Sequence, residues 1–128
     1  MPTSITHDVK VDVETKYQPQ QSNPLGDDFL FAYRITIENH SDQTIQLLRR
    51  HWFIFDSNGE KREVEGEGVV GLQPVLKPGE VHRYISGCNL KSDLGRMTGT
   101  YLFERVSDNT RFEVQIPEFT MIVPYRQN

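Results

Sequence analysis

The chain has 128 residues and a formal net charge of −4 at pH 7. This length predicts one domain with a core large enough to fold without disulfides, and the single cysteine, Cys88, excludes an internal disulfide framework. The negative charge excludes a general attraction to nucleic acid or to anionic lipid, so we expect no nucleic acid and no membrane as partner. The cysteine usage, together with the lack of a signal-peptide pattern in the sequence, predicts a cytoplasmic location.

Apolar and polar residues alternate along most of the chain, which is the period of a half-buried strand. The segment 5–17 predicts one long N-terminal strand, and 18–27 is loop chemistry with two prolines and a glycine. A second strand is predicted over 29–37 and a turn over 39–42. Over 44–56 both the odd-numbered and the even-numbered positions are partly apolar. This predicts a central strand or a change of face at a bulge near Arg49 and Arg50.

The second half of the chain continues the same period. The segment 56–59 predicts a hairpin that returns over 61–65, and a Pro-Gly turn is predicted over 76–80. Further strands are predicted over 81–86, around 97–103 and around 112–116, with a continuation to residue 123, whereas 87–95 is predicted to be loop. Because no segment shows a helical stripe, the pattern predicts an all-β fold, an antiparallel β-sandwich.

Three glycines, Gly66, Gly68 and Gly71, have the spacing Gly-x-Gly-x-x-Gly, which marks a dinucleotide-binding turn when it lies between a strand and a helix. Pro74 and Pro78 follow closely, so a helix cannot begin there and run on. Two interpretations stay open. The favoured one is a backbone device that permits positive φ and close crossing of the sheets, and the other is a loop whose amides hold an anion.

The sequence shows no catalytic constellation, and no cofactor is expected. Cys88 has no identifiable base, and His82 and Ser86 would lie ~13 Å apart on one strand. The available metal ligands lack the spacing of a tight site: they are His7, His40, His51, His82, Glu63, Glu65, Glu67 and Glu80. The glutamates at 63, 65 and 67 alternate on one face, which indicates a weak divalent cation site or a solvated strand edge.

Aromatic residues concentrate in the third predicted strand, at Trp52, Phe53 and Phe55. Most of them are expected in the core, because large inward residues fill a sandwich. If both faces of this strand are apolar, one face is available to a partner or to another protomer. An exposed edge strand likewise allows a homodimer.

Several blocks of the sequence are similar to the ApaG family, also called CorD. The resemblance covers nearly the whole chain. It rests on Arg-Arg-His-Trp at 49–52, the glycine segment 66–74, Leu-Lys-Pro-Gly-Glu at 76–80, Tyr-Ile-Ser-Gly-Cys at 84–88, Gly-Arg-Met-Thr-Gly-Thr-Tyr at 95–101, and two blocks within 111–119. It implies a single ApaG domain over 1–128 with an immunoglobulin-like, fibronectin type III-like antiparallel β-sandwich.

The resemblance also implies a bacterial protein linked to cobalt resistance and magnesium efflux. Eukaryotic relatives are interaction domains in F-box proteins and in a DNA polymerase δ-interacting protein, and no enzymatic activity comes with the family. We therefore expect a non-enzymatic module for an unidentified protein partner, with Gly66, Gly68, Gly71, Arg50 and His51 as candidate surface. The alternative is a nucleotide or pyrophosphate-binding accessory protein that uses the glycine loop, and weak phosphate or divalent cation binding is allowed.

Overall fold

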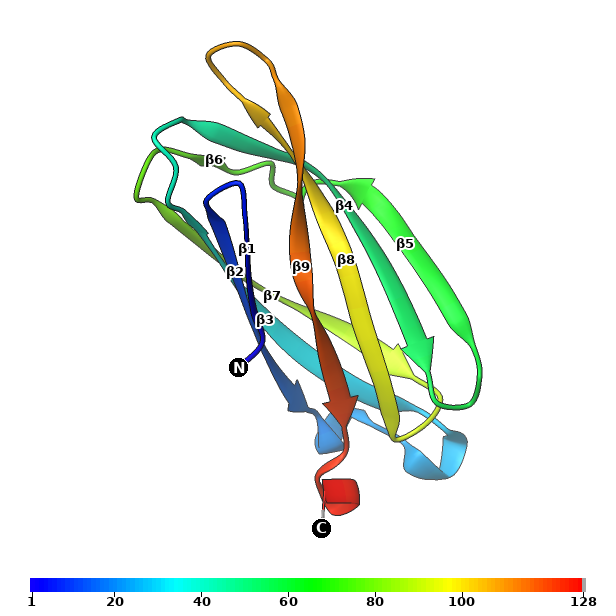
Figure 1. Ribbon diagram of the computed structural model, residues 1–128. Helices are drawn as coiled ribbons and strands as arrows, with labels where there is room; N and C mark the ends of the chain where they lie inside the picture. Colours follow the sequence, from blue (N-terminus) through cyan, green and yellow to red (C-terminus); the bar gives the residue numbers. More distant parts are fainter. Residues whose placement is uncertain (128) are drawn as a thin grey trace.

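Two antiparallel sheets packed face to face form the structure, a computed structural model that describes residues 1–127 (Figure 1). The first sheet has the order β1 (Thr3–Thr6), β2 (Val9–Tyr17), β3 (Phe29–Asn39) and β7 (Val81–Leu90). The second has the order β5 (Lys61–Glu67), β4 (Ile45–Asp56), β8 (Leu94–Arg105) and β9 (Arg111–Ile122), and β6 (Val75–Leu76) pairs with the start of β4. Three short 3₁₀ helices complete the described chain: η1 (Pro19–Gln21), η2 (Pro24–Gly26) and η3 (Pro124–Gln127). The predicted antiparallel, immunoglobulin-like sandwich is confirmed.

The prediction of one long N-terminal strand over 5–17 was wrong. His7 and Asp8 have φ of 49° and 62°, and they form a tight turn between β1 and β2. Two central residues with positive φ give the twist that a two-residue hairpin requires. Because the alternation of residue types continues through this turn, the period alone did not reveal it.

Strand β4 contains the predicted bulge. Its register against β8 shifts between Leu47 and Arg49, so one extra residue enters β4 there. Leu47 is buried before the bulge and Trp52 after it, although they differ in parity. The mixed apolar pattern of the sequence is therefore explained by the bulge, and β4 is also central, between β5 and β8.

The predicted loop over 87–95 was mostly wrong, because β7 continues to Leu90 and β8 begins at Leu94. Gly87 pairs with Ala32 inside the sheet. At Gly95, a Cβ atom would lie 2.8 Å from the carbonyl oxygen of Phe55. Both glycines therefore belong to strands, and only Gly95 is explained by a close approach of backbones.

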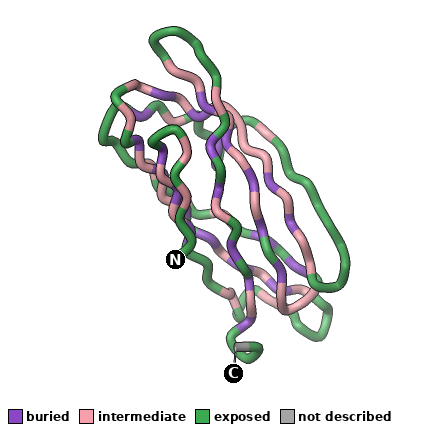
Figure 2. The backbone as a smooth tube through the Cα atoms, viewed as in Figure 1, coloured by how far each residue is buried: buried purple, intermediate pink, exposed green. Residues whose placement is uncertain are grey.

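The core fills the space between the sheets (Figure 2). Its centre is an aromatic cluster in which Trp52 lies 5.5 Å from Tyr33 and 5.9 Å from Phe119, measured between ring centroids. The two sides of the sandwich differ. On one side β1 crosses to β9, where the Ser4 hydroxyl donates to the Gln115 carbonyl (2.7 Å) and the Gln115 amide donates to the Thr6 hydroxyl (3.1 Å). On the other side β5 and β7 are unpaired edges of different sheets, and the sandwich is open between them.

Candidate functional site

A cleft of about 230 Å³ opens between strands β5 and β7. Residues of β4 and β8 form its floor, and the polar walls come from β3, β4, β5 and β7. The apolar floor includes Trp52, Ile54 and Met97, and the polar walls are Tyr33, Arg50, Arg62, Ser86, Cys88 and Asn89. The cleft thus combines an apolar floor with several hydrogen-bonding groups, which is the usual composition of a small binding site.

Arg50 points into the cleft because it lies beyond the bulge of β4, on the same face as Trp52. Its Nη1 donates to the carbonyl oxygens of Glu67 (2.9 Å) and Gly68 (3.0 Å). These bonds attach the end of β5 to β4 and fix the guanidinium at one end of the cleft. The remaining N–H groups of the guanidinium are still available for other acceptors.

Three phenols lie close to this guanidinium. The hydroxyls of Tyr84 and Tyr101 form a hydrogen bond with each other across the two sheets. Burial raises the pKa of Tyr33, of Tyr84 and of Tyr101, and the positive charge of Arg50 only partly opposes this shift. The phenols therefore stay protonated and can donate hydrogen bonds at any physiological pH.

Arg62 forms the outer wall of the cleft. Its Nη2 donates to the carbonyl oxygen of Asn89 and lies 3.5 Å from Sγ of Cys88, so it spans from β5 to β7. Burial raises the pKa of the Cys88 thiol, and Arg62 opposes that shift. A buried thiol with a raised pKa is a poor nucleophile. Cys88 is therefore buried inside β7, and its surroundings give no support to a nucleophilic role.

The glycine motif is a backbone device in this structure. Gly66 lies in β5, and Val70 and Gly71 have φ of 47° and 77° at the centre of a tight turn. The amide of Val69 donates to the carbonyl of Leu72 (2.8 Å), and the amide of Leu72 returns a bond of 3.0 Å. Gly68 has φ of 63°, and a Cβ atom there would collide with the carbonyl oxygen of Leu72.

The motif offers few free amides to an anion. The amides of Gly68, Val69 and Leu72 all donate to backbone carbonyls, and Arg50 is bound to carbonyl oxygens of the same segment. The chain then continues into β6 rather than a helix. A dinucleotide site of the strand-turn-helix kind is therefore excluded here, and anion binding by the loop stays a prediction.

Arg50 and His51 do not act together, because adjacent residues of a strand point to opposite faces. His51 lies on the outer face, where its Nε2 is 3.3 Å from Oε2 of Glu63 and its ring stacks on Phe53 at 4.4 Å. Glu65 lies 3.8 Å from Arg49 on the same face. Two of the three alternating glutamates thus face basic groups. Within residues 1–127, no group of three or more histidine, cysteine or acidic side chains is arranged to hold a metal ion.

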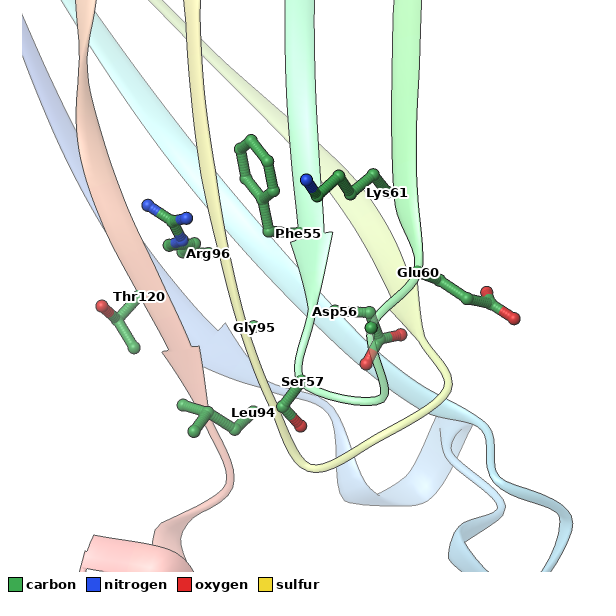
Figure 3. Close-up of a pocket in the computed structure, with 10 residues that line it drawn as sticks. Phe55, Asp56, Ser57, Glu60, Lys61, Leu94, Gly95, Arg96 and Thr120 are labelled. Carbon is green, nitrogen blue, oxygen red and sulfur yellow. The ribbon is translucent and has the colours of Figure 1, made fainter.

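A second hollow, of about 410 Å³, lies on the outer face of the second sheet (Figure 3). The ring of Phe55 is held between cations, with Cζ of Arg96 at 4.4 Å and Nζ of Lys61 at 5.9 Å from its centroid. Arg96 is paired with Glu118 at 2.6 Å. Trp52 is in the core, whereas Phe53 and Phe55 are half-buried on the outer face, so the expectation that most of these aromatic residues lie in the core was wrong. Because Arg96 is paired with Glu118 and the lining also contains Asp56 and Glu60, this hollow attracts an anion less than the cleft does.

The fold and the arrangement of its edges define the class of an immunoglobulin-like β-sandwich domain. A family model described as the ApaG domain matches residues 19–105. The chain belongs to the ApaG domain family. It is 45% identical over 125 residues to Protein ApaG of Beijerinckia indica, covering 98% of this chain and 95% of that protein. It is 50% identical over 115 residues to Protein ApaG of Acidithiobacillus ferrooxidans, covering 89% of each.

Solved structures agree with this assignment. The putative ApaA protein of Bordetella pertussis is 41% identical and superimposes with a TM-score of 0.88, covering 96% of each chain. PapD-like domain 7 of human CEP192 has a TM-score of 0.52 at 8% identity, which shows the shared sandwich fold alone. None of the helices in the described part of the chain is long and apolar enough to cross a membrane.

Proposed function

We propose that this chain is a non-enzymatic protein-interaction module that binds an extended segment of a partner protein along strand β7. The observation that supports this proposal is the free edge of β7, which is 10 residues long and, among the strands of residues 1–127, pairs with β3 alone. A strand edge with unpaired backbone groups is a template for one more strand, and recognition by strand addition uses this property. Through such a partner the chain would contribute to cobalt resistance and magnesium efflux, as the family resemblance implies.

The register shows which backbone groups of β7 face the free edge. The carbonyl oxygen of Leu30 accepts a bond from the amide of Gln18, so the backbone of Leu30 points away from β7. Leu30 is opposite Asn89, and in an antiparallel pair such non-bonded positions alternate with bonded ones. The N–H and C=O groups that point to the free edge therefore belong to alternate residues, namely Val81, Arg83, Ile85, Gly87 and Asn89, and of these the Asn89 carbonyl already accepts from Arg62. The side chains of Val81, Arg83 and Ile85 are exposed on the outer face.

The other sheet edges carry features that protect against pairing. Strand β5 has five charged residues among its seven, whereas β7 has Arg83 as its one charged residue among ten. Strand β1 has four residues, and β9 contains Pro117 and contacts β1. Short strands, charges and proline are the means by which natural sheets avoid unwanted pairing. The long, weakly charged edge of β7 lacks them, which supports its use as a binding edge.

The test separates backbone pairing from side-chain contact. Ile85→Pro removes an N–H group that points to the free edge, while the hydrogen bonds from β7 to β3 are kept. Ile85→Ala removes the same side chain and keeps the N–H group. A partner protein is first recovered from a bacterial lysate with the native chain. Its affinity for the Ala variant should be within about threefold of its affinity for the native chain. Its affinity for the Pro variant should be at least about tenfold lower, because a lost hydrogen bond and a steric block add up.

Hydrogen exchange then locates the contact. In the complex, the amides of Arg83, Ile85 and Gly87 should become protected. Equal binding by the Pro variant, or protection confined to the glycine loop, would contradict the proposal. If the native chain alone forms a concentration-dependent dimer that the Pro variant cannot form, the bound strand is a second copy of β7.

A further inference from the structure

We propose that the cleft between β5 and β7 is an oxyanion-binding site, in which Arg50 and Arg62 supply the positive charge and the hydroxyls of Tyr33 and Ser86 supply further hydrogen bonds. All four side chains line the same cavity. The ligand is a small group bearing phosphate or carboxylate oxygens. The site adjoins the edge of β7, where Arg62 donates to the Asn89 carbonyl, but it uses neither the edge N–H groups nor the amides of the glycine loop.

The charges in the cleft are not balanced by the protein. Arg34, Arg49 and Arg96 on the outer faces each lie against a glutamate. Within residues 1–127, Arg50 and Arg62 form no ion pair with a carboxylate, and the lining of the cleft contains no Asp or Glu. Their protein acceptors are neutral: three backbone carbonyls and the Cys88 thiol. Two guanidinium groups that line one cavity without a counter-charge favour an anion there.

The surroundings strengthen this attraction. Trp52 and Met97, which form part of the floor, are 2% and 1% exposed. Charges interact more strongly beside such an apolar, poorly hydrated wall than on the open surface. Protonated phenols and hydroxyls donate to oxyanions without adding a negative charge. The cleft therefore offers both charge and directed donors to one small group.

The volume limits the size of the ligand. A cavity of about 230 Å³ holds roughly seven to eight waters at about 30 Å³ each. It is smaller than the roughly 300–1,000 Å³ of sites for drug-sized ligands. A phosphate group or an acidic side chain fits, whereas a whole nucleotide would have to extend outside. Two sources remain for this one chemistry. One is a free phosphate-type anion, and the other is an acidic side chain of a segment bound along β7, whose alternate residues would point inward as Ser86 does.

Trp52 is the single tryptophan of the chain and lines the cleft, so its fluorescence reports on occupancy. We would titrate the native chain with inorganic phosphate and with pyrophosphate at constant ionic strength. A saturable change in Trp52 emission is expected. Arg62→Gln should weaken binding at least tenfold, because the exposed Arg62 can be replaced without disturbing the core. The matched control is Arg83→Gln, which removes the same charge from the outer face of β7 and should change affinity less than twofold.

The sources are distinguished by peptides. Two extended peptides are compared as competitors of phosphate. In one, Val alternates with Glu, and in the other, Val alternates with Gln. Preferential displacement by the Glu peptide identifies an acidic side chain as ligand, and phosphate binding with no such preference identifies a free anion. The site is overturned if neither phosphate nor the Glu peptide gives a saturable change, or if the two arginine variants weaken binding equally. Ile85→Pro should leave phosphate binding unchanged, so failure of the strand-addition proposal would be seen separately.

Discussion

The two sides of the sandwich are built in different ways. On the closed side, β1 folds over β9, and hydroxyl and backbone groups of the two sheets satisfy one another. On the open side, two unpaired strand edges face each other across a cleft that holds two guanidinium groups and several hydroxyls. Polar groups cost stability when they lack a hydrogen-bond partner. On the closed side such groups are bonded to one another, and on the open side some of them remain available to a ligand. The comparison indicates that the closed side serves mainly stability and that the open side is free for binding.

The largest expected effect tests whether the closed side dominates stability. Ile116 in β9 is 1% exposed, and Ile116→Ala should lower the free energy of unfolding by about 2–5 kcal/mol, because a cavity is left in a packed core. Ile54 lines the cleft at 5% exposure, so Ile54→Ala should cost less, about 2 kcal/mol, since water can enter the space. Urea denaturation measures both. Equal losses would remove the distinction between the two sides.

The glycine motif provides a second, smaller test near the open side. Gly68→Ala should cost about 2–4 kcal/mol, because the new methyl group collides with the Leu72 carbonyl and φ is 63°. Gly71→Ala has φ of 77° but free space around the Cβ position, so about 1 kcal/mol is expected from backbone strain alone. Thermal and urea unfolding of both variants give the comparison. If the two substitutions cost the same, the tight crossing at Gly68 is not what the motif provides.

The pair of tyrosines that joins the sheets predicts an asymmetry. Tyr101 is 0% exposed, and within the described residues its hydroxyl is bonded to that of Tyr84. Tyr84→Phe leaves a fully buried hydroxyl without its partner and should cost about 1–3 kcal/mol. Tyr101→Phe leaves the hydroxyl of Tyr84, a half-buried rather than fully buried residue, and should cost about 1 kcal/mol or less. A double-mutant cycle by urea unfolding checks this order, and the reverse order would mean that water does not reach Tyr84.

The sequence predicted most of the fold because the alternation of residue types reports burial directly. It also revealed the bulge of β4, since the apolar parity changes there. It missed the turn at His7 and Asp8, where the alternation continues through the turn. It assigned Gly87 to a loop because glycine is common in turns, although here it is paired inside a sheet.

The candidate site was less predictable, because it depends on which strands form the facing edges of the two sheets. The sequence grouped Arg50 with His51, but the pleat sends them to opposite faces. It did not select Arg62, although Arg62, Val64 and Gly66 share the inward parity of β5 opposite Ile54, Trp52 and Arg50. That parity was visible in the sequence. The cleft between β5 and β7 was not, since it arises from the packing of two sheets and leaves no local pattern.

The smallest expected effect concerns pH and the open side. His82 faces inward on β7, and its Nε2 is buried with no hydrogen-bond partner among the described residues. Burial lowers the pKa of His82 from its ordinary value of 6.5, because the charged ring is poorly solvated there. The unfolded chain therefore binds a proton more readily than the folded chain. The stabilising contribution of neutral His82 is complete above pH 6.5 and is lost as the pH falls through the lowered pKa of the folded state.

His82→Phe isolates this contribution, since a ring of similar shape remains and the charge cannot form. The unfolding free energy of the native chain minus that of the variant should fall as the pH is lowered from 7 to 5.5, as urea denaturation at each pH would measure. All other titrating groups are common to both proteins and cancel in the difference. A difference that does not change with pH would mean that protonated His82 finds solvent or a partner through the open side. The cleft would then extend further toward β6 than its present lining indicates.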